Sequence, residues 1–380
     1  MFNRHVRFVI CIVVICIVYG AAGHEESVHR ESLLVQSLEL EKKLENAKAF
    51  LEDSALNSYL NTVLQNINQN MLNGNYKLQI RVLAFPVFNA FALPHGSIYI
   101  CTGLLAGIEN EAQLAALIGH EMTHITNDHA SKDLINKKRT ALSGTRLQIG
   151  LDFFIGSLAG AISNVAMKSA ITGYSKDLER EADSVGLVRI KAAGYAPIEF
   201  RNLFLILKQQ IEKDNIKQPY FFSTHPALTE RIENYYALVG NDTLRAARGK
   251  RDQKNFIRMI HPVLLVDGIM NKACGKWSVA EQNFLKLVSV DSSNYSALIN
   301  LGDIIRLRAC PQPNKKAFTW YRKAMKCDNS DGEALRKLGF YFYKIGQLDS
   351  ASHYLTIYMH QYSSSPYIKT VKDYVSQCDK

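Results

Sequence analysis

The feature that most constrains this chain is the five-residue motif His120-Glu121-Met122-Thr123-His124. Two histidines four positions apart face the same side of a helix, so both imidazoles can reach one metal ion there. Apolar residues surround the motif, at Leu114, Leu117, Ile118, Met122 and Ile125. The pattern predicts a buried, rigid helix over residues 109–127, with Glu121 on a neighbouring edge where it can touch metal-bound water without being a ligand.

A catalytic zinc site needs a third protein ligand and leaves one position for water. His129 is the nearest histidine, five positions after His124. The metzincin pattern instead has six positions, with a glycine at the third, where this chain has Asn127. We therefore interpret His129 as a surface or packing histidine and look elsewhere for the third ligand.

Glu179 is the better candidate for the third ligand. It lies four positions before Asp183 in a segment predicted to be helical, so the two carboxylates share a face. One carboxylate can bind zinc while the other accepts the second N–H of a ligand histidine. The alternative is a solvated acidic face, to which Glu181 would also belong, and these residues taken alone favour that alternative.

The order of four sequence elements favours Glu179 as a metal ligand over the solvated acidic face. The HExxH motif is followed by an ExEAD element at residues 179–183, and this pair resembles metallopeptidase family 48. Residues 89–94, with Gly96 and then Gly103-Leu104-Leu105, are similar to the edge strand beside that family's active site. Ser223-Thr224-His225-Pro226, with Arg231-Ile232 after it, is similar to the family's downstream histidine element. The resemblance covers residues 30–240, and loosely the tail.

The resemblance implies a role for each matched residue. Glu121 would be catalytic, Asp183 would support a ligand from behind, and one Zn²⁺ per chain would be bound by His120, His124 and Glu179. His225 would lie near the metal and either stabilise the oxyanion or occupy the open coordination position in a latent state; the alternative is a helix-start histidine before Pro226. The predicted substrate edge comprises Asn89, Ala90 and Phe91.

Two positions depart from the family pattern. His95 stands where the family usually has glycine, which puts the shape of the substrate edge in doubt. Lys176 stands where the family usually has arginine, which weakens any bidentate pairing there. Neither departure affects the proposed metal ligands.

The N-terminus predicts export. Arg4 and Arg7 precede an apolar run over residues 8–19, and the small residues Gly20-Ala21-Ala22-Gly23 follow. This is the pattern of a signal peptide, cleaved here after Gly23, and it predicts a periplasmic protein. The alternative is an uncleaved anchor. Residues 153–167 are uncharged but too few to span a bilayer, so we predict a buried or site-covering helix within residues 150–173.

The C-terminal third carries a repeat. Gly268, Gly302 and Gly339 are spaced by 34 and 37 residues, while Ala280, Ala317 and Ala351 are spaced by 37 and 34. One three-residue insertion, placed at residues 310–313, explains both series. A period of 34 with small residues in each helix resembles tetratricopeptide repeats, although their typical tryptophan and closing proline are missing. The alternative is an ordinary helical bundle.

Periodicity therefore predicts a mainly α (α+β) chain. Strands are expected at residues 77–82 and 97–101, where polar and apolar residues alternate or an apolar run follows a turn. The predicted organisation is a signal peptide (1–23), a helical zincin-type peptidase domain with a small sheet (24–245), and a helical repeat domain (255–362).

The function expected is zinc-dependent hydrolysis of peptide bonds in unfolded or misassembled exported, outer-membrane proteins. The periplasmic, beta-barrel assembly-enhancing branch of the family fits the export signal and the repeats, which could contact the outer-membrane assembly machinery. The alternative function is a periplasmic chaperone or scaffold with a latent peptidase site. The net charge of +10 is spread along the chain, which excludes a nucleic-acid site and is compatible with peripheral membrane association. A membrane-embedded peptidase would need several spanning helices.

Overall fold

The computed structural model describes residues 30–68, 77–139, 174–214, 228–239, 243–309, 314–327 and 332–378. The described chain is mainly helical, with one three-stranded sheet, and this confirms the predicted fold class. The chain divides into two compact units, Met1–Gln253 and Lys254–Lys380. The predicted signal peptide, the predicted helix within residues 150–173 and His225 lie outside the described residues. Among the described helices, none combines the length and apolar character that crossing a membrane requires.

The sheet lies in the first unit and has the order β1-β3-β2. Strands β1 (Gln79–Leu83) and β3 (Ser97–Cys101) lie where alternation predicted strands, and they pair in parallel. Strand β2 (Ala90–Ala92) pairs with β3 in the antiparallel sense and lies at the edge. The turn between β2 and β3 requires Gly96, whose φ of +112° and closeness to the Lys77 carbonyl leave no room for a side chain.

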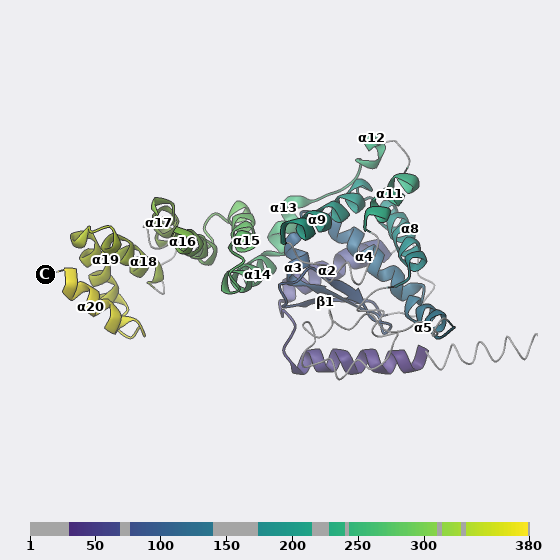
Figure 1. The fold of residues 1–380 in the computed structure, drawn as a ribbon, viewed down its shortest axis with the longest axis horizontal. Coiled ribbons are helices and arrows are strands. Elements are labelled where there is room, and N and C mark those ends of the chain that lie inside the picture. The colour runs from purple at the N-terminus through teal and green to yellow at the C-terminus, as the bar shows by residue number, and fades with distance from the viewer. Residues whose placement is uncertain are drawn as a thin grey trace, which may run out of the picture. The chain divides into compact units, whose positions relative to one another are not determined.

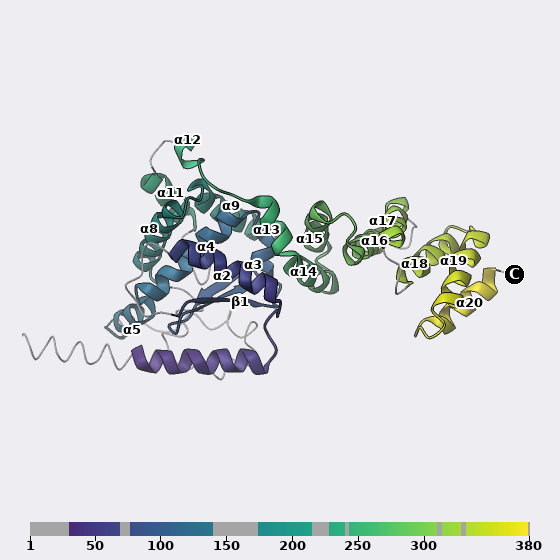
Figure 2. The ribbon, with the colours of Figure 1, turned by 180° about the vertical axis from the view of Figure 1, so that it is seen from behind.

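The sheet is covered on both faces (Figures 1 and 2). A helix over residues 30–46 lies along one face, where Leu33, Leu40 and Leu44 join a core with Phe91 and Tyr99. The other face is covered by helices of the same unit, which carry the candidate site. Those helices and their short neighbours are α2 (Ser54–Asn68), α3 (Thr102–Gly107), α4 (Glu111–Thr126), α5 (His129–Arg139), α8 (Lys176–Ala192), α9 (Ile198–Asp214), α11 (Leu228–Val239) and α12 (Thr243–Ala246).

Helix α4 is the central helix of this unit and is buried from Glu111 to Ile125. It begins at Asn110, whose side chain accepts a hydrogen bond from the Gln113 N–H at 3.0 Å. A buried carboxylate, Glu199, in turn accepts from the Asn110 amide at 3.0 Å and from the Gln113 amide at 2.8 Å. These bonds satisfy polar groups that burial would otherwise penalise, so the apolar helix has a fixed start.

Helices α4 and α8 cross at two glycines. A Cβ atom on Gly186 would lie 3.0 Å from the backbone nitrogen of His120, and one on Gly119 would lie 3.2 Å from the Gly186 carbonyl oxygen. The absence of side chains therefore lets the two backbones approach closely at the level of the HExxH motif. This crossing decides how far residues of α8 can reach toward the histidines of α4.

The second unit consists of consecutive helices joined by short connections: α13 (Gln253–Met259), α14 (His261–Ala273), α15 (Trp277–Val290), α16 (Tyr295–Ala309), α17 (Lys315–Cys327), α18 (Glu333–Lys344), α19 (Leu348–Gln361) and α20 (Ile368–Cys378). The glycines of the repeat series face a bulky side chain of the following helix: Gly268 faces Phe284, and Gly302 faces Tyr321. The alanines of the second series are buried. Small residues thus permit close helix pairs, whereas the tetratricopeptide assignment and the predicted domain limits stay predictions.

The α4–α8 crossing yields a first prediction. Gly186→Val is expected to lower the free energy of unfolding by about 1–3 kcal/mol, because its side chain would collide with the backbone of α4. Ser184→Val, on the same helix, is the control and should change the free energy of unfolding by less than about 0.5 kcal/mol. Urea denaturation followed by circular dichroism measures both, and equal losses in the two variants would contradict the role assigned to the crossing.

Candidate metal centre

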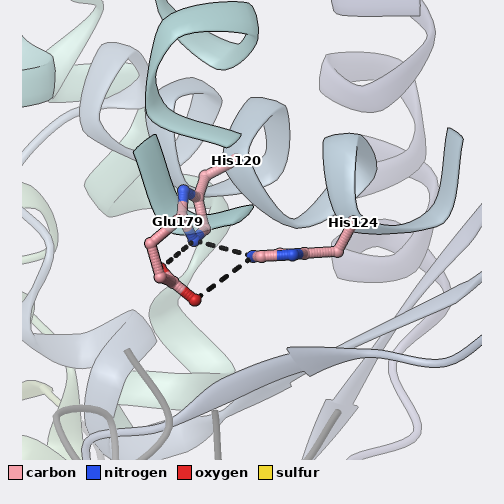
Figure 3. A group of neighbouring side chains, drawn as sticks. All are labelled: His120, His124 and Glu179. Atoms are coloured by element: carbon pink, nitrogen blue, oxygen red, sulfur yellow. Dashed lines mark hydrogen bonds and ion pairs between the residues drawn. The ribbon is translucent and has the colours of Figure 1, made fainter. Parts of the chain in front are cut away.

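Two helices bring the predicted ligands together. His120 and His124 lie one turn apart on α4, and Glu179 lies in the first turn of α8. The Nε2 atoms of the histidines are 3.1 Å apart, and the Glu179 oxygens lie 3.4 Å from His120 Nε2 and 3.8 Å from His124 Nε2. Figure 3 shows the three side chains converging on one point. Within the described residues, this is the one group of histidine, cysteine and carboxylate side chains arranged to hold a metal ion.

The spacing of these donor atoms fits a metal ion. Ligands of a tetrahedral zinc at ordinary bond lengths are about 3.3 Å apart, and the three observed separations bracket that value. All three side chains are buried, with at most 3% of each residue exposed. Two imidazole nitrogens that face each other across 3.1 Å need a cation or a proton between them, so the donor set itself favours a positive charge at this point.

A buried ion pair supports His120 from behind. Its Nδ1 atom lies 2.9 Å from Asp183 Oδ1, and Arg231 of α11 donates to both Asp183 oxygens at 2.7 and 2.6 Å. Burial and the Arg231 charge lower the pKa of His120, but hydrogen bonds to Asp183 and Glu179 outweigh them and raise it to about 9. Burial would raise the pKa of Asp183, but the Arg231 charge and the His120 hydrogen bond lower it instead. Asp183 therefore stays ionised.

His124 has different neighbours. The ring of Tyr174 stacks on it, with centroids 4.2 Å apart and an angle of 17° between the planes. His124 Nδ1 lies 2.8 Å from His129 Nδ1. Burial, followed by the charge of Glu121, raises the pKa of the Tyr174 hydroxyl, and burial lowers the pKa of His129. Both neighbours are therefore uncharged near neutral pH.

Glu121 lies within the same buried region, with 1% of the residue exposed. Its charge acts on Tyr174, which contacts His124, and on Arg231, which contacts Asp183. These two effects place the carboxylate close to the metal-binding group. Glu121 is not part of the group of converging ligand atoms.

The predicted substrate edge is buried in the structure, main chain included. Asn89, Ala90 and Phe91 are at most 2% exposed, and Phe91 stacks on Tyr99 at 5.1 Å. Asn89 accepts from the Cys101 N–H, and Leu93 donates to the Ser97 carbonyl, so alternate residues of this segment bond to β3. By the antiparallel pattern, the peptide groups of Ala90 and Ala92 point away from β3, along the outer edge.

Part of this neighbourhood differs from what the sequence predicts. His129 is fully buried and contacts His124, so of the two alternatives, surface or packing, the structure excludes the surface position; it is not one of the converging ligands. Glu181 is bonded to Asn127 at 2.5 Å and lies 3.4 Å from His129, so it is more than a solvated acidic residue. Tyr174 had received no role. Its place directly before the helix that carries Glu179 was the available signal.

Comparisons with known proteins agree with this site. Residues 51–238 match the model of Peptidase family M48. The chain is 29% identical over 174 residues to mitochondrial metalloendopeptidase OMA1 of Saccharomyces cerevisiae, a match that covers 44% of this chain and 48% of that protein. It is 23% identical over 205 residues to the beta-barrel assembly-enhancing protease of Yersinia pestis, covering 51% of this chain and 41% of that protein. The chain thus spans less than half of either relative.

The Arg231–Asp183 pair yields a second prediction. Arg231→Met is expected to lower the free energy of unfolding by about 3–5 kcal/mol, because it leaves the buried Asp183 carboxylate without its cation. Arg180→Met is the matched control: it removes an exposed pair with Glu230, between the same two helices, and should be nearly neutral. Chemical denaturation measures both. If the two variants lost similar stability, Arg231 would not be the anchor of the site.

Proposed function

Because residues 51–238 form a Peptidase family M48 domain, we propose that this chain is a zinc-dependent endopeptidase. The observation that carries the proposal is the convergence of His120, His124 and Glu179, with Asp183 as a supporting carboxylate within hydrogen-bonding distance of His120. Two imidazoles and one carboxylate, which leave one position for water on a tetrahedral ion, are the ligand set of catalytic zinc in peptidases. The metalloendopeptidase names of the relatives support the same class of reaction.

Each residue near the site has a defined task in this proposal. His120, His124 and Glu179 would hold zinc, which when bound polarises the scissile carbonyl and makes water a better nucleophile. Glu121 accepts the proton of the attacking water and delivers it to the leaving amine. Asp183 and Arg231 keep His120 in the tautomer that offers Nε2 to the metal. His225 remains a candidate for stabilising the oxyanion, or for closing the site in a latent state.

The substrate would bind as an added strand. The peptide groups of Ala90 and Ala92 that point away from β3 would provide the donors and acceptors for an extended chain in the manner of β-augmentation, once this edge, which is at most 3% exposed in the structure, is uncovered. Contacts between α4 and β2 bring this edge to the helix that carries the histidines. Main-chain pairing selects for extended, unfolded segments more than for particular side chains. This preference suits unfolded or misassembled exported proteins.

We place the enzyme in the cell envelope, in the periplasm. The proposal rests on the export pattern of residues 1–23 and on the similarity to a beta-barrel assembly-enhancing protease. Outer-membrane proteins are then the expected substrates, and the helical unit Lys254–Lys380 is the expected contact with their assembly machinery. A second candidate function, chaperone or scaffold action through that unit, is favoured by its being a compact unit of its own that contains none of the proposed metal ligands.

A third prediction tests the catalytic base. Glu121→Gln is expected to retain zinc but to cleave a labelled unfolded protein about a hundred- to ten-thousandfold more slowly, because the amide cannot accept the proton. Cleavage and bound metal are measured on the same preparation. A variant as active as the parent would show that Glu121 is not the base. If the inactive full-length variant still prevents aggregation of unfolded substrate, the chaperone function gains support.

A fourth prediction tests the metal. The parent is expected to bind one zinc ion per chain, and Glu179→Gln to lose most of it, because an amide is a poor substitute for a carboxylate ligand. Glu109→Gln, an exposed residue, is the control and should bind like the parent. Elemental analysis after dialysis decides the outcome. Undiminished zinc in Glu179→Gln would remove it from the ligand set.

A further inference from the structure

The histidine that does not join the metal ligands lies directly behind one of them. His129 is the first residue of α5 and is fully buried. Its Nδ1 atom lies 2.8 Å from His124 Nδ1, and the two rings meet edge to face, with centroids 4.9 Å apart and planes at 76°. An approach of 2.8 Å between two nitrogens is a hydrogen bond, so one nitrogen carries a proton and the other accepts it.

The metal site decides which nitrogen carries that proton. His124 Nε2 faces His120 Nε2 and Glu179, so it must keep its lone pair for a metal ion. The single proton of a neutral His124 is then on Nδ1 and is donated to His129 Nδ1. A neutral His129 that accepts at Nδ1 carries its own proton on Nε2. One chain of donors and acceptors therefore leads outward from the metal position.

Glu181 lies close to the outer end of that chain, although His129 Nε2 has no hydrogen-bond partner among the described residues. Its Oε2 atom is 3.4 Å from His129 Nε2, while its Oε1 atom accepts from the Asn127 amide at 2.5 Å and lies 3.7 Å from Lys132 Nζ. Two elements thus hold the carboxylate: the turn after α4 and the helix α5. A negative charge at this position favours the Nε2–H tautomer of His129 electrostatically, because it attracts a proton on Nε2 and has none of its own to donate.

The turn between α4 and α5 makes the contact geometrically possible. Helix α4 ends at Thr126, and Asp128 adopts a φ of +50°, in the left-handed region. The chain reverses there, so His129 returns toward His124 instead of continuing along α4. Asparagine and aspartate tolerate this conformation better than most residues do. The strained residue therefore serves the placement of the imidazole.

We propose that His129 and Glu181 are positioning residues for the metal ligand His124, holding its tautomer and ring orientation as Asp183 and Arg231 hold those of His120. The ligand histidines would then have unlike partners: a carboxylate behind His120 and a neutral imidazole behind His124. Partners of this kind typically contribute ten- to hundredfold to metal affinity. The inference rests on the proposed zinc function and concerns how strongly the metal is held. The alternative is that His129 only fills space.

Leucine and asparagine at position 129 separate the two roles, because they have nearly the same shape. Asparagine places an oxygen acceptor where His129 Nδ1 lies, whereas leucine fills the space without an acceptor. His129→Leu is expected to weaken zinc binding about ten- to hundredfold, and His129→Asn to recover most of that loss. The dissociation constant is measured on the full-length protein by competition with a chromophoric chelator. Leu134→Ala, a buried change on the same helix, should lower stability without weakening zinc binding.

Equal zinc affinity in the leucine and asparagine variants would overturn the proposal, since a packing role predicts no difference between them. If His129→Leu does not fold, Glu181→Ala replaces it, because that side chain is 38% exposed. It should weaken zinc binding several-fold, and an unchanged affinity would count against the proposal. Failure of the proposed function looks different: the parent itself would then bind no zinc.

Discussion

The crossing of α4 and α8 is the contact on which the site depends. An HExxH helix supplies two imidazoles by its own periodicity, but the third ligand must come from another element. Gly119 and Gly186 bring the α8 backbone close enough for the short Glu179 side chain to reach both nitrogens. The apolar burial of α4 and its fixed start at Asn110 hold the crossing in place.

Charge balance explains why this buried cluster suits a divalent cation. Glu121, Glu179 and Asp183 carry three formal negative charges, and Arg231 carries one positive charge. The remaining charge of −2 would be costly in a buried site, yet it matches a zinc ion. The raised pKa of His120 has the same cause, because a proton on His120 supplies part of the positive charge that the buried carboxylates lack. The metal position is thus built into the electrostatics of the fold.

Sequence reasoning succeeded where a local period or an ordered set of motifs carried the information. The two histidines follow from their spacing, strand β1 from alternation, and strand β3 from an apolar run after a turn. Glu179 needed the resemblance, because 55 positions separate it from His124 and no period connects them. His129 could not be placed from spacing, because counting along a helix assumes that the helix continues. The chain reversal at Asp128 depends on a left-handed backbone conformation, which a single aspartate in the sequence does not predict.

The buried side chains of the edge strand bear on selectivity. Since Phe91 and its neighbours pack inward, the proposed recognition uses peptide groups, which every chain possesses. Such an edge distinguishes an extended segment from a folded one but hardly one sequence from another. Selection among substrates must then come from what brings them to the edge. The proposed contacts of the second unit would supply that selection. The endopeptidase and scaffold functions would then act together in one chain, because the helical unit would select the partner and the peptidase unit would cleave the substrate wherever it is unfolded.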